Sequence, residues 1–212
     1  WDGSLIQTVK YHYGDAIVAI ADPERASDET YTYTFLSWNK ALGTCTGNAS
    51  FTAQYESTFI NYTVVFKDYD GETISTNTYH YGDTVTVPTA PTRETDVVGS
   101  YTFKAWDSTV VNCAGNATYT ATYEITYIDY TVIFKNEDGT VLSTNTYHYG
   151  DEVTVPSTPT KDADNTYTYT FKAWDAEVVA CAGNATYTAT YVSEHIDYTV
   201  VFKGEDGTVL AS

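Results

Sequence analysis

The chain has 212 residues, of which 42% are hydrophobic and 18% are charged, and its formal net charge is −18. This apolar share can bury cores, which excludes a disordered tail, and no apolar run approaches the roughly 20 residues of a membrane-spanning helix. The acidic residues are spread along the chain without a basic patch, so we expect no binding to nucleic acid and a self-repelling surface.

Strands are expected along most of the chain, because its 21 Tyr residues, together with Thr and Val, suit a pleated, half-buried surface. Residues 62–67, YTVVFK, alternate with the period of two that predicts a strand. Asp70-Gly71 follows and predicts a tight hairpin in which both turn residues have positive φ. The return strand is expected over residues 72–82, ETISTNTYHYG.

The following strands are shorter and are separated by turn signals. Gly82-Asp83 predicts a turn that leads into a short strand, VTVP, at residues 85–88. Two further strands, separated by a CAGN turn, are expected at residues 101–107 and 117–123.

The connection over residues 88–100 contains two prolines and permits at most a short helix. In the matching stretch near the start of the sequence, Asp22 would cap one helical turn with Pro23 at its first position.

The boundary between one set of strands and the next has no flexible residues. Residues 117–135 contain no Gly or Pro, and Tyr119, Ala121 and Tyr123 share one side of the expected strand. We therefore expect the last strand of one set to run almost directly into the first strand of the next. Such a joint is stiff, unlike a Gly/Ser linker.

The whole pattern recurs with a period of 68 residues and without insertions. Four residue types mark the period: Trp38, Trp106 and Trp174; Cys45, Cys113 and Cys181; Gly14, Gly82 and Gly150; Pro23, Pro91 and Pro159. We expect four domains: repeat 1 (residues 1–61), repeat 2 (62–129), repeat 3 (130–197) and a further fragment (198–212).

Repeat 1 has no counterpart of YTVVFK, whereas the fragment carries one. Its six residues are the expected inter-subunit strand: Tyr198, Thr199, Val200, Val201, Phe202 and Lys203. One hypothesis is that this strand pairs with repeat 1 of another copy, which builds a head-to-tail filament by strand addition. The rival explanation is that the sequence is a window on a longer array of neighbouring repeats. The lack of Met and of a signal peptide favours a processed piece or an internal segment.

The ordered motifs YTVxFK, DG, TVLSTxTYxYGDxVTVP, YTFKAWD and NATYTATY resemble the InlB B-repeat, also called the Listeria–Bacteroides repeat. Residues 130–197 match it most cleanly, and the resemblance covers essentially the whole chain. It implies a mainly β fold, in which small β-grasp-like domains follow in tandem in an elongated rod. The grasp helix would be short or absent, because residues 88–99 are poor in helix formers.

The resemblance also implies a location and a role. Members of this family recur in secreted and cell-surface proteins of bacteria, including adhesin-like ones, and usually serve as stalk or spacer modules. The family has no catalytic residues to transfer, so we expect a protein that is not an enzyme and that needs no cofactor or metal.

NTYHYGD, which occurs at residues 77–83 and 145–151, is the motif most like a chemical site. His80 would serve as a metal ligand or an acid/base, but no second His or paired Cys stands nearby, so a structural role is favoured. Tyr79 and Tyr81 are expected on one strand face and His80 on the other. The open question is whether His12, His80 and His148 form an exposed row.

Cys45, Cys113 and Cys181 occur once per repeat, so a repeat cannot form an internal disulfide. A buried or turn-facing thiol is expected, with an intermolecular disulfide as the alternative. Four asparagines match the glycosylation sequon: Asn48, Asn61, Asn116 and Asn184. The alternative for the Gly-Asn pairs is a hairpin turn in which both residues tolerate positive φ.

Three further kinds of site are less favoured than simpler structural roles: a Ca²⁺ site, a sugar-stacking surface and an isopeptide crosslink. The acidic Asp-Gly turns offer too few ligands for Ca²⁺, and the Tyr stripes are more often cross-strand pairs than sugar-stacking surfaces. Lys–Asn isopeptide crosslinks, from Lys67, Lys135 and Lys203, would need burial that the sequence does not show.

Two classes of function follow. The leading hypothesis is a stalk whose partners are copies of itself or neighbouring repeats. The alternative is an adhesin module that binds a host surface protein or glycan through repeated weak sites.

Overall fold

The computed structural model describes residues 3–211, and in this range every helix or strand element is a β-strand. The mainly β prediction is therefore confirmed, and the helix that was expected to be short or absent is absent from the described residues. Within the same range no helix is long and apolar enough to cross a membrane.

The strands follow the 68-residue period. Their bounds are β1 Tyr31–Trp38, β2 Ala53–Phe59, β3 Tyr62–Lys67, β4 Thr73–Tyr79, β5 Gly99–Trp106, β6 Ala117–Tyr127, β7 Tyr130–Lys135, β8 Val141–Tyr147, β9 Tyr167–Trp174, β10 Ala185–His195, β11 Phe202–Lys203 and β12 Val209–Ala211. The expected strand VTVP at residues 85–88 does not form, because no other strand pairs with it.

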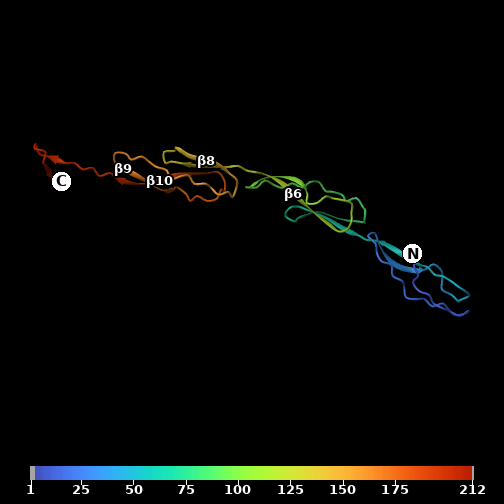
Figure 1. Ribbon diagram of the computed structural model, residues 1–212. Coiled ribbons are helices and arrows are strands. Elements are labelled where there is room, and N and C mark those ends of the chain that lie inside the picture. The colour runs from blue at the N-terminus through green and yellow to red at the C-terminus, as the bar shows by residue number, and fades with distance from the viewer. Residues whose placement is uncertain (1–2, 212) are drawn as a thin grey trace. The chain divides into compact units, whose positions relative to one another are not determined.

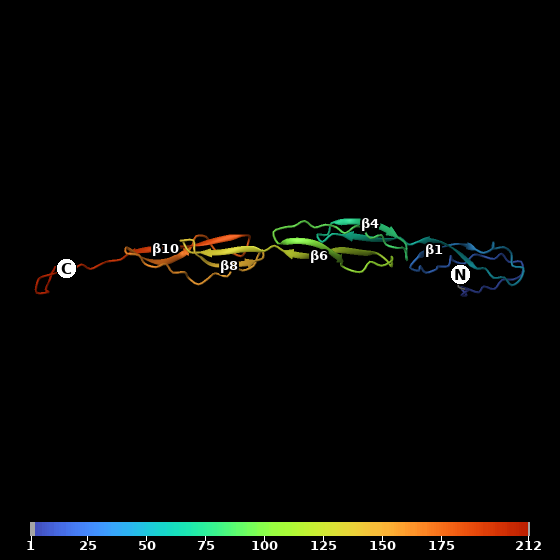
Figure 2. The same ribbon diagram turned by 90° about the horizontal axis from the view of Figure 1, so that it is seen from above.

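Two four-stranded sheets share one topology, β4-β3-β6-β5 and β8-β7-β10-β9 (Figure 1 and Figure 2). The middle pair is parallel, with Val64 beside Ala117 in one sheet and Val132 beside Ala185 in the other. The hairpins β3–β4 and β7–β8 are antiparallel. A parallel pair needs a long crossover, which the Pro-containing connection supplies here without a helix.

The described chain forms two compact units. Within the described residues, unit 1 comprises residues 3–92 and 103–124, and unit 2 comprises residues 93–102 and 125–211. The division passes through β5 and β6 and does not follow the 68-residue period, so the repeat boundaries remain a prediction from the sequence. Each unit contains one cluster of buried side chains.

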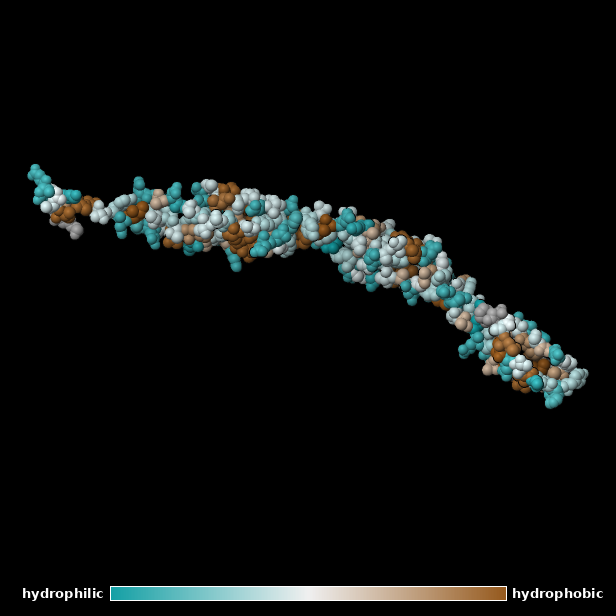
Figure 3. Space-filling model, in the orientation of Figure 1, coloured by the Kyte–Doolittle hydropathy of each residue, from teal (hydrophilic) through white to brown (hydrophobic). Residues whose placement is uncertain are grey.

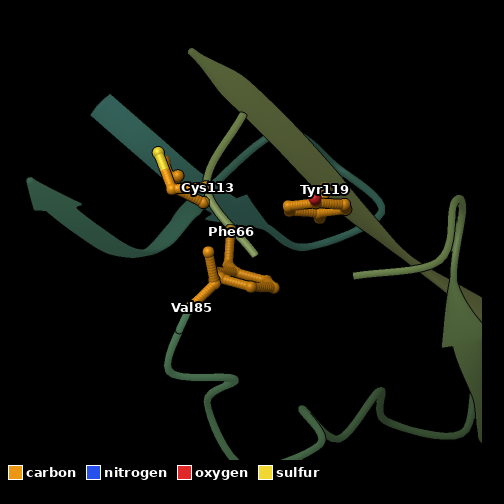
Figure 4. Close-up of a cluster of buried hydrophobic side chains, with 5 residues drawn as sticks. Phe66, Val85, Cys113 and Tyr119 are labelled. Atoms are coloured by element: carbon orange, nitrogen blue, oxygen red, sulfur yellow. The ribbon is translucent and has the colours of Figure 1, made fainter. Parts of the chain in front are cut away.

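The core of unit 1 gathers residues that lie far apart in the sequence. Val64 and Phe66 point inward from β3, which pairs with β6. Their partners are Val85, Cys113 and Tyr119 (Figure 4). Phe66 is 0% exposed and stacks on Tyr119 with ring centroids 5.1 Å apart. Unit 2 repeats this cluster around Phe134, with Val132, Val153, Cys181 and Tyr187.

The Asp-Gly turns differ from the tight hairpin that the sequence predicts. Only glycine has positive φ among the described residues, so Asp70 does not, whereas Gly71 has a φ of 91°. The amide of Gly71 donates to the carbonyl of Asp68, and the amide of Asp68 donates to the carbonyl of Glu72. The loop is thus longer than two residues, and a register shift at Lys67 accommodates it. The same correction holds for Asn116, which follows Gly115 without positive φ.

The connection between β4 and β5 is extended and is held by side chains instead of a helix. The guanidinium of Arg93 lies 3.5 Å from the ring centroid of Tyr101, whose hydroxyl donates to Asp96 at 2.9 Å. A cation over an aromatic face and a charge-assisted hydrogen bond thus fix the strand after the loop. The helical turn expected at Asp22 and Pro23 is absent, because an equivalent contact of Arg25 with Tyr33 holds that loop.

Candidate functional site

The YGD part of NTYHYGD forms a clasp with the CAG turn. The amide of Gly82 donates to the carbonyl of Cys113 at 2.7 Å, and the amide of Cys113 donates to the carbonyl of Asp83 at 2.8 Å. Gly82 has a φ of 85°, which favours glycine. Asp83 also accepts a hydrogen bond from the amide of His80 at 2.8 Å, so its side chain closes the turn. Gly150 and Cys181 form the same clasp in unit 2.

The histidines of this motif contact the last strand of the preceding repeat. In unit 1 the ring centroids of Phe59 and His80 are 4.4 Å apart, and in unit 2 those of Tyr127 and His148 are 4.9 Å apart. The side chains of His80 and His148 are 43% and 47% exposed, whereas that of His12 is 98% exposed. The three histidines therefore do not form an equally exposed row.

The histidine rings differ in the number of carboxylates that they contact. Nε2 of His148 lies 3.2 Å from Asp129 and its Nδ1 lies 3.8 Å from Asp151. His80 has only the second type of contact, at 3.6 Å from Asp83, because Asn61 stands where Asp129 would be. The described residues contain no group of three or more side chains suited to hold a metal ion.

A tyrosine at the start of a repeat donates a hydrogen bond to a backbone carbonyl of the preceding repeat. The hydroxyl of Tyr62 donates to the carbonyl of Glu29 at 2.9 Å, and that of Tyr130 donates to the carbonyl of Val97 at 2.9 Å. Tyr198 makes the same bond to Asn165 at 3.1 Å. These bonds, the aromatic–histidine contacts and the two residues between consecutive strands define what we call the joint.

Each joint lies inside one compact unit, because residues 29–80 belong to unit 1 and residues 97–102 and 125–148 belong to unit 2. The joint is thus packed like the rest of the unit. The sequence predicts its shortness, but it does not predict the bond from Tyr to a carbonyl; the only signal for it is the recurrence of Tyr at this position.

The sequon asparagines have different environments. Oδ1 of Asn116 accepts a hydrogen bond from the amide of Thr63 at 2.8 Å, and Asn184 binds Thr131 in the same way. These two asparagines therefore fix the first strand of their repeat. Asn48 and Asn61 are exposed. Glycosylation at all four remains a prediction.

The three cysteines are free thiols. Cys113 and Cys181 are each 3% exposed and lie in the core clusters, as expected for a buried thiol. Cys45 is half-buried. The intermolecular disulfide stays a prediction, for which Cys45 is the most accessible candidate.

The expected inter-subunit strand is largely unpaired. Only Phe202 and Lys203 belong to a strand, β11, which pairs with β12. Tyr198, Val200 and Phe202 are 69%, 70% and 66% exposed. Figure 3 shows this hydrophobic surface near the C-terminal end.

The loop carboxylates that hold tyrosines have shifted pKa values. The hydroxyl of Tyr169 and the amides of Thr166 and Tyr167 donate to Asp164 and lower its pKa from the usual 3.8. The same bond raises the pKa of Tyr169 above its usual value. Asp28 follows this pattern with Tyr33. For Asp96 the bond from the amide of Val98 is the main cause of the lowered pKa.

Comparison with known proteins identifies two matching segments. The model of the Listeria-Bacteroides repeat domain matches residues 62–127 and 130–195. Two proteins of Evansella cellulosilytica, named "Putative membrane protein" and "Putative Gly-rich membrane protein", are each 27% identical, over 96% and 81% of this chain. The chain spans 32% and 20% of their length.

Among solved structures, the chain is similar to the streptococcal high identity repeats in tandem (SHIRT) domains 3-4 from a cell surface protein. It is 20% identical, with a TM-score of 0.33, and the match covers 64% of this chain and 99% of that one.

Proposed function

Since this chain belongs to the Listeria-Bacteroides repeat domain family, we propose that it is a non-enzymatic stalk or spacer segment of a bacterial extracellular surface protein. The observation that carries the proposal is the joint. Two residues separate Phe59 of β2 from Tyr62 of β3, and Tyr127 of β6 from Tyr130 of β7. A spacer needs such short connections, because a flexible linker would let the domains collapse onto one another.

Side-chain contacts at each joint add resistance to bending. Tyr130 has its ring against the core of unit 2 while its hydroxyl bonds Val97 of the preceding repeat. Rotation about the joint would break this bond and separate Tyr127 from His148. The net charge of −18 also opposes bending, since like charges along the chain repel one another.

The location at the bacterial surface is part of the proposal. It is supported by the names of the two Evansella proteins, which both describe membrane proteins. Tandem repeats of this family in a longer chain fit a segment that connects other parts of such a protein.

Small-angle X-ray scattering tests the spacer role. We would compare the chain with a variant that has Gly-Gly-Ser-Gly inserted between Ile128 and Asp129, and with a control that has the same insertion in the loop after Asp162. The joint insertion should shorten the average dimension and broaden the distance distribution, while the control should leave both unchanged. Equal curves for the joint insertion and the original chain would contradict the proposal.

A second candidate function, adhesion, is supported by one observation. Tyr13, Tyr81 and Tyr149 occupy the same position in three repeats and are 84%, 43% and 44% exposed. Exposed aromatic rings at regular intervals suit repeated weak contacts with sugars or proteins, which gain from avidity. Binding of the chain to a glycan array that is lost when all three tyrosines become Ala would support adhesion, and no signal at high protein density would contradict it.

A further inference from the structure

The strands through which the chain enters and leaves a repeat are neighbours in its sheet. In repeat 2 the chain enters through β3 and leaves at the end of β6, and these two strands pair directly in parallel over residues 64–67 and 117–120. In repeat 3, β7 and β10 pair in the same way over residues 132–135 and 185–188. The entering and leaving strands are therefore bonded to each other, despite the long connection between them.

This arrangement determines how a repeat responds to tension along the chain. Because β3 and β6 are parallel, a pull on the start of β3 and a pull on the end of β6 act in opposite directions along the two strands. The evenly spaced hydrogen bonds of a parallel pair run from strand to strand, so they are all loaded at once. A hairpin that is pulled at its open end, in contrast, loses its bonds one after another.

Side-chain hydrogen bonds reinforce the parallel pair at both of its ends. At the start, the amide of Thr63 in β3 donates to Oδ1 of Asn116, the residue before β6, at 2.8 Å. At the other end, the hydroxyl of Tyr123 in β6 donates to Asp68, the residue after β3, at 2.8 Å. Both bonds connect the entering strand with the leaving strand, so sliding one strand past the other would break them.

Stacked and buried side chains protect the middle of the pair. The ring of Phe66 in β3 stacks on that of Tyr119 in β6, with centroids 5.1 Å apart (Figure 4). Val64 and Phe66 are 1% and 0% exposed, and β3 has a strand on each side. Water therefore has little access to the backbone bonds of the pair and cannot readily replace a bond that is being stretched.

Repeat 3 contains the same three contacts between its entering and leaving strands. They are Thr131 with Asn184 at 2.8 Å, Phe134 with Tyr187 at 5.1 Å and Tyr191 with Asn136 at 2.7 Å. Asn136 stands where repeat 2 has Asp68, so the bond from tyrosine is kept although its acceptor changes from a carboxylate to an amide. The two repeats therefore share the position of this bond and not its charge.

We propose that each repeat bears tension along the chain through this parallel pair, which we call the shear clamp. It comprises β3 and residues 116–123 in repeat 2, and β7 and residues 184–191 in repeat 3. This function goes beyond that of a spacer, because a spacer resists bending at its joints, whereas the shear clamp resists stretching within a repeat. A chain whose joints bent freely would still bear tension through its clamps.

The rest of each repeat lies outside the path of the force. Residues 69–115 connect the two clamp strands of repeat 2, so they are stretched only after the clamp has opened. They contain a matched hydrogen bond, in which the hydroxyl of Tyr79 accepts from the amide of Thr86 at 3.0 Å. Tyr147 accepts from Thr154 in repeat 3 at 3.1 Å. These two bonds stabilise the connection but do not cross the clamp.

Optical tweezers with handles at the two ends of the chain test the proposal. The clamp variant carries Tyr123→Phe and Tyr191→Phe, and the control carries Tyr79→Phe and Tyr147→Phe. Each removes one hydroxyl bond per repeat and keeps the ring. At a given force the clamp variant should unfold repeats 2 and 3 about fivefold faster than the original chain, as expected for the loss of one hydrogen bond that resists forced unfolding. The control should unfold at the original rate.

Urea denaturation without force separates a clamp from a general loss of stability. Both variants should lose similar amounts of free energy of unfolding, because each loses one hydrogen bond per repeat. A second pair of variants tests the other end of the clamp. Asn116→Ala with Asn184→Ala should speed unfolding under force, whereas Asp at both positions keeps the acceptor oxygen and should restore the original rate.

Two results would overturn the inference. One is a clamp variant that unfolds under force at the rate of the original chain. The other is a control that accelerates as much as the clamp variant, because the force would then not be concentrated on the parallel pair. Neither result affects the spacer role, which is measured by the scattering of the joint insertion.

Discussion

The hydroxyl of Tyr130 donates a hydrogen bond of 2.9 Å to the carbonyl of Val97, a residue of the preceding repeat. The same tyrosine begins β7, and its ring packs against the buried cluster of unit 2. One side chain therefore links the core of one repeat to the connection of the repeat before it. This relationship recurs at Tyr62, whereas Tyr198 repeats only the hydrogen bond and is 69% exposed.

Replacement of Tyr130 by Phe removes this bond and keeps the ring. We expect the free energy of unfolding to fall by about 0.5–1.5 kcal/mol, the usual net value of one hydrogen bond. Urea denaturation followed by tryptophan fluorescence measures it. Tyr149→Phe is the matched control, because that residue is 44% exposed, and should change the stability by less than about 0.5 kcal/mol. Equal effects of the two substitutions would contradict the role of the joint.

Phe134 and Phe202 occupy the same position of the repeat in opposite environments. Phe134 is 0% exposed, so Phe134→Ala should destabilise repeat 3 by about 3–5 kcal/mol through lost packing and a cavity. Phe202 is 66% exposed, so Phe202→Ala should cost less than about 0.5 kcal/mol. Denaturation curves at low protein concentration compare the two, and a large effect at residue 202 under these conditions would be inconsistent with the structure.

The three thiols should react at different rates. Cys45 is half-buried, whereas Cys113 and Cys181 are 3% exposed within their clusters. Ellman's reagent should therefore titrate one thiol per chain rapidly in buffer and all three in guanidinium chloride. A Cys45→Ser chain should lose the fast phase, and a fast phase that remains would show that a core opens readily.

Acid should destabilise the loops in which an aspartate accepts a hydrogen bond from a tyrosine hydroxyl. The bond from Tyr169 and two backbone amides lowers the pKa of Asp164 below 3.8, so this carboxylate stabilises the folded chain above pH 3.8. That contribution is lost as the pH falls through the lowered pKa. Asp164→Asn should therefore flatten the fall in stability between about pH 5 and pH 2. Urea titrations across this range test it, with the neighbouring Asp162→Asn as a control that should keep the original slope.

The period of 68 residues and most of the strands were predictable, because they depend on local signals; the strand expected at residues 85–88 did not form. Alternation in YTVVFK gave β3 at residues 62–67, and the lack of Gly and Pro after Ala117 predicted a short joint, which β6 and β7 confirm with two intervening residues. The family resemblance was confirmed by the match to residues 62–127 and 130–195. The place of Cys113 before a strand predicted a buried or turn-facing thiol, and the thiol is buried.

The sequence by itself determined the repeat and most of the strands, since periodicity and turn chemistry act between near neighbours. Only the tertiary structure decided which strands pair in parallel, because that choice depends on contacts such as Val64 with Ala117 across more than 50 residues. It also decided the role of the histidines: the ring of His80 meets Phe59 of another repeat, and no local pattern encodes a contact between repeats.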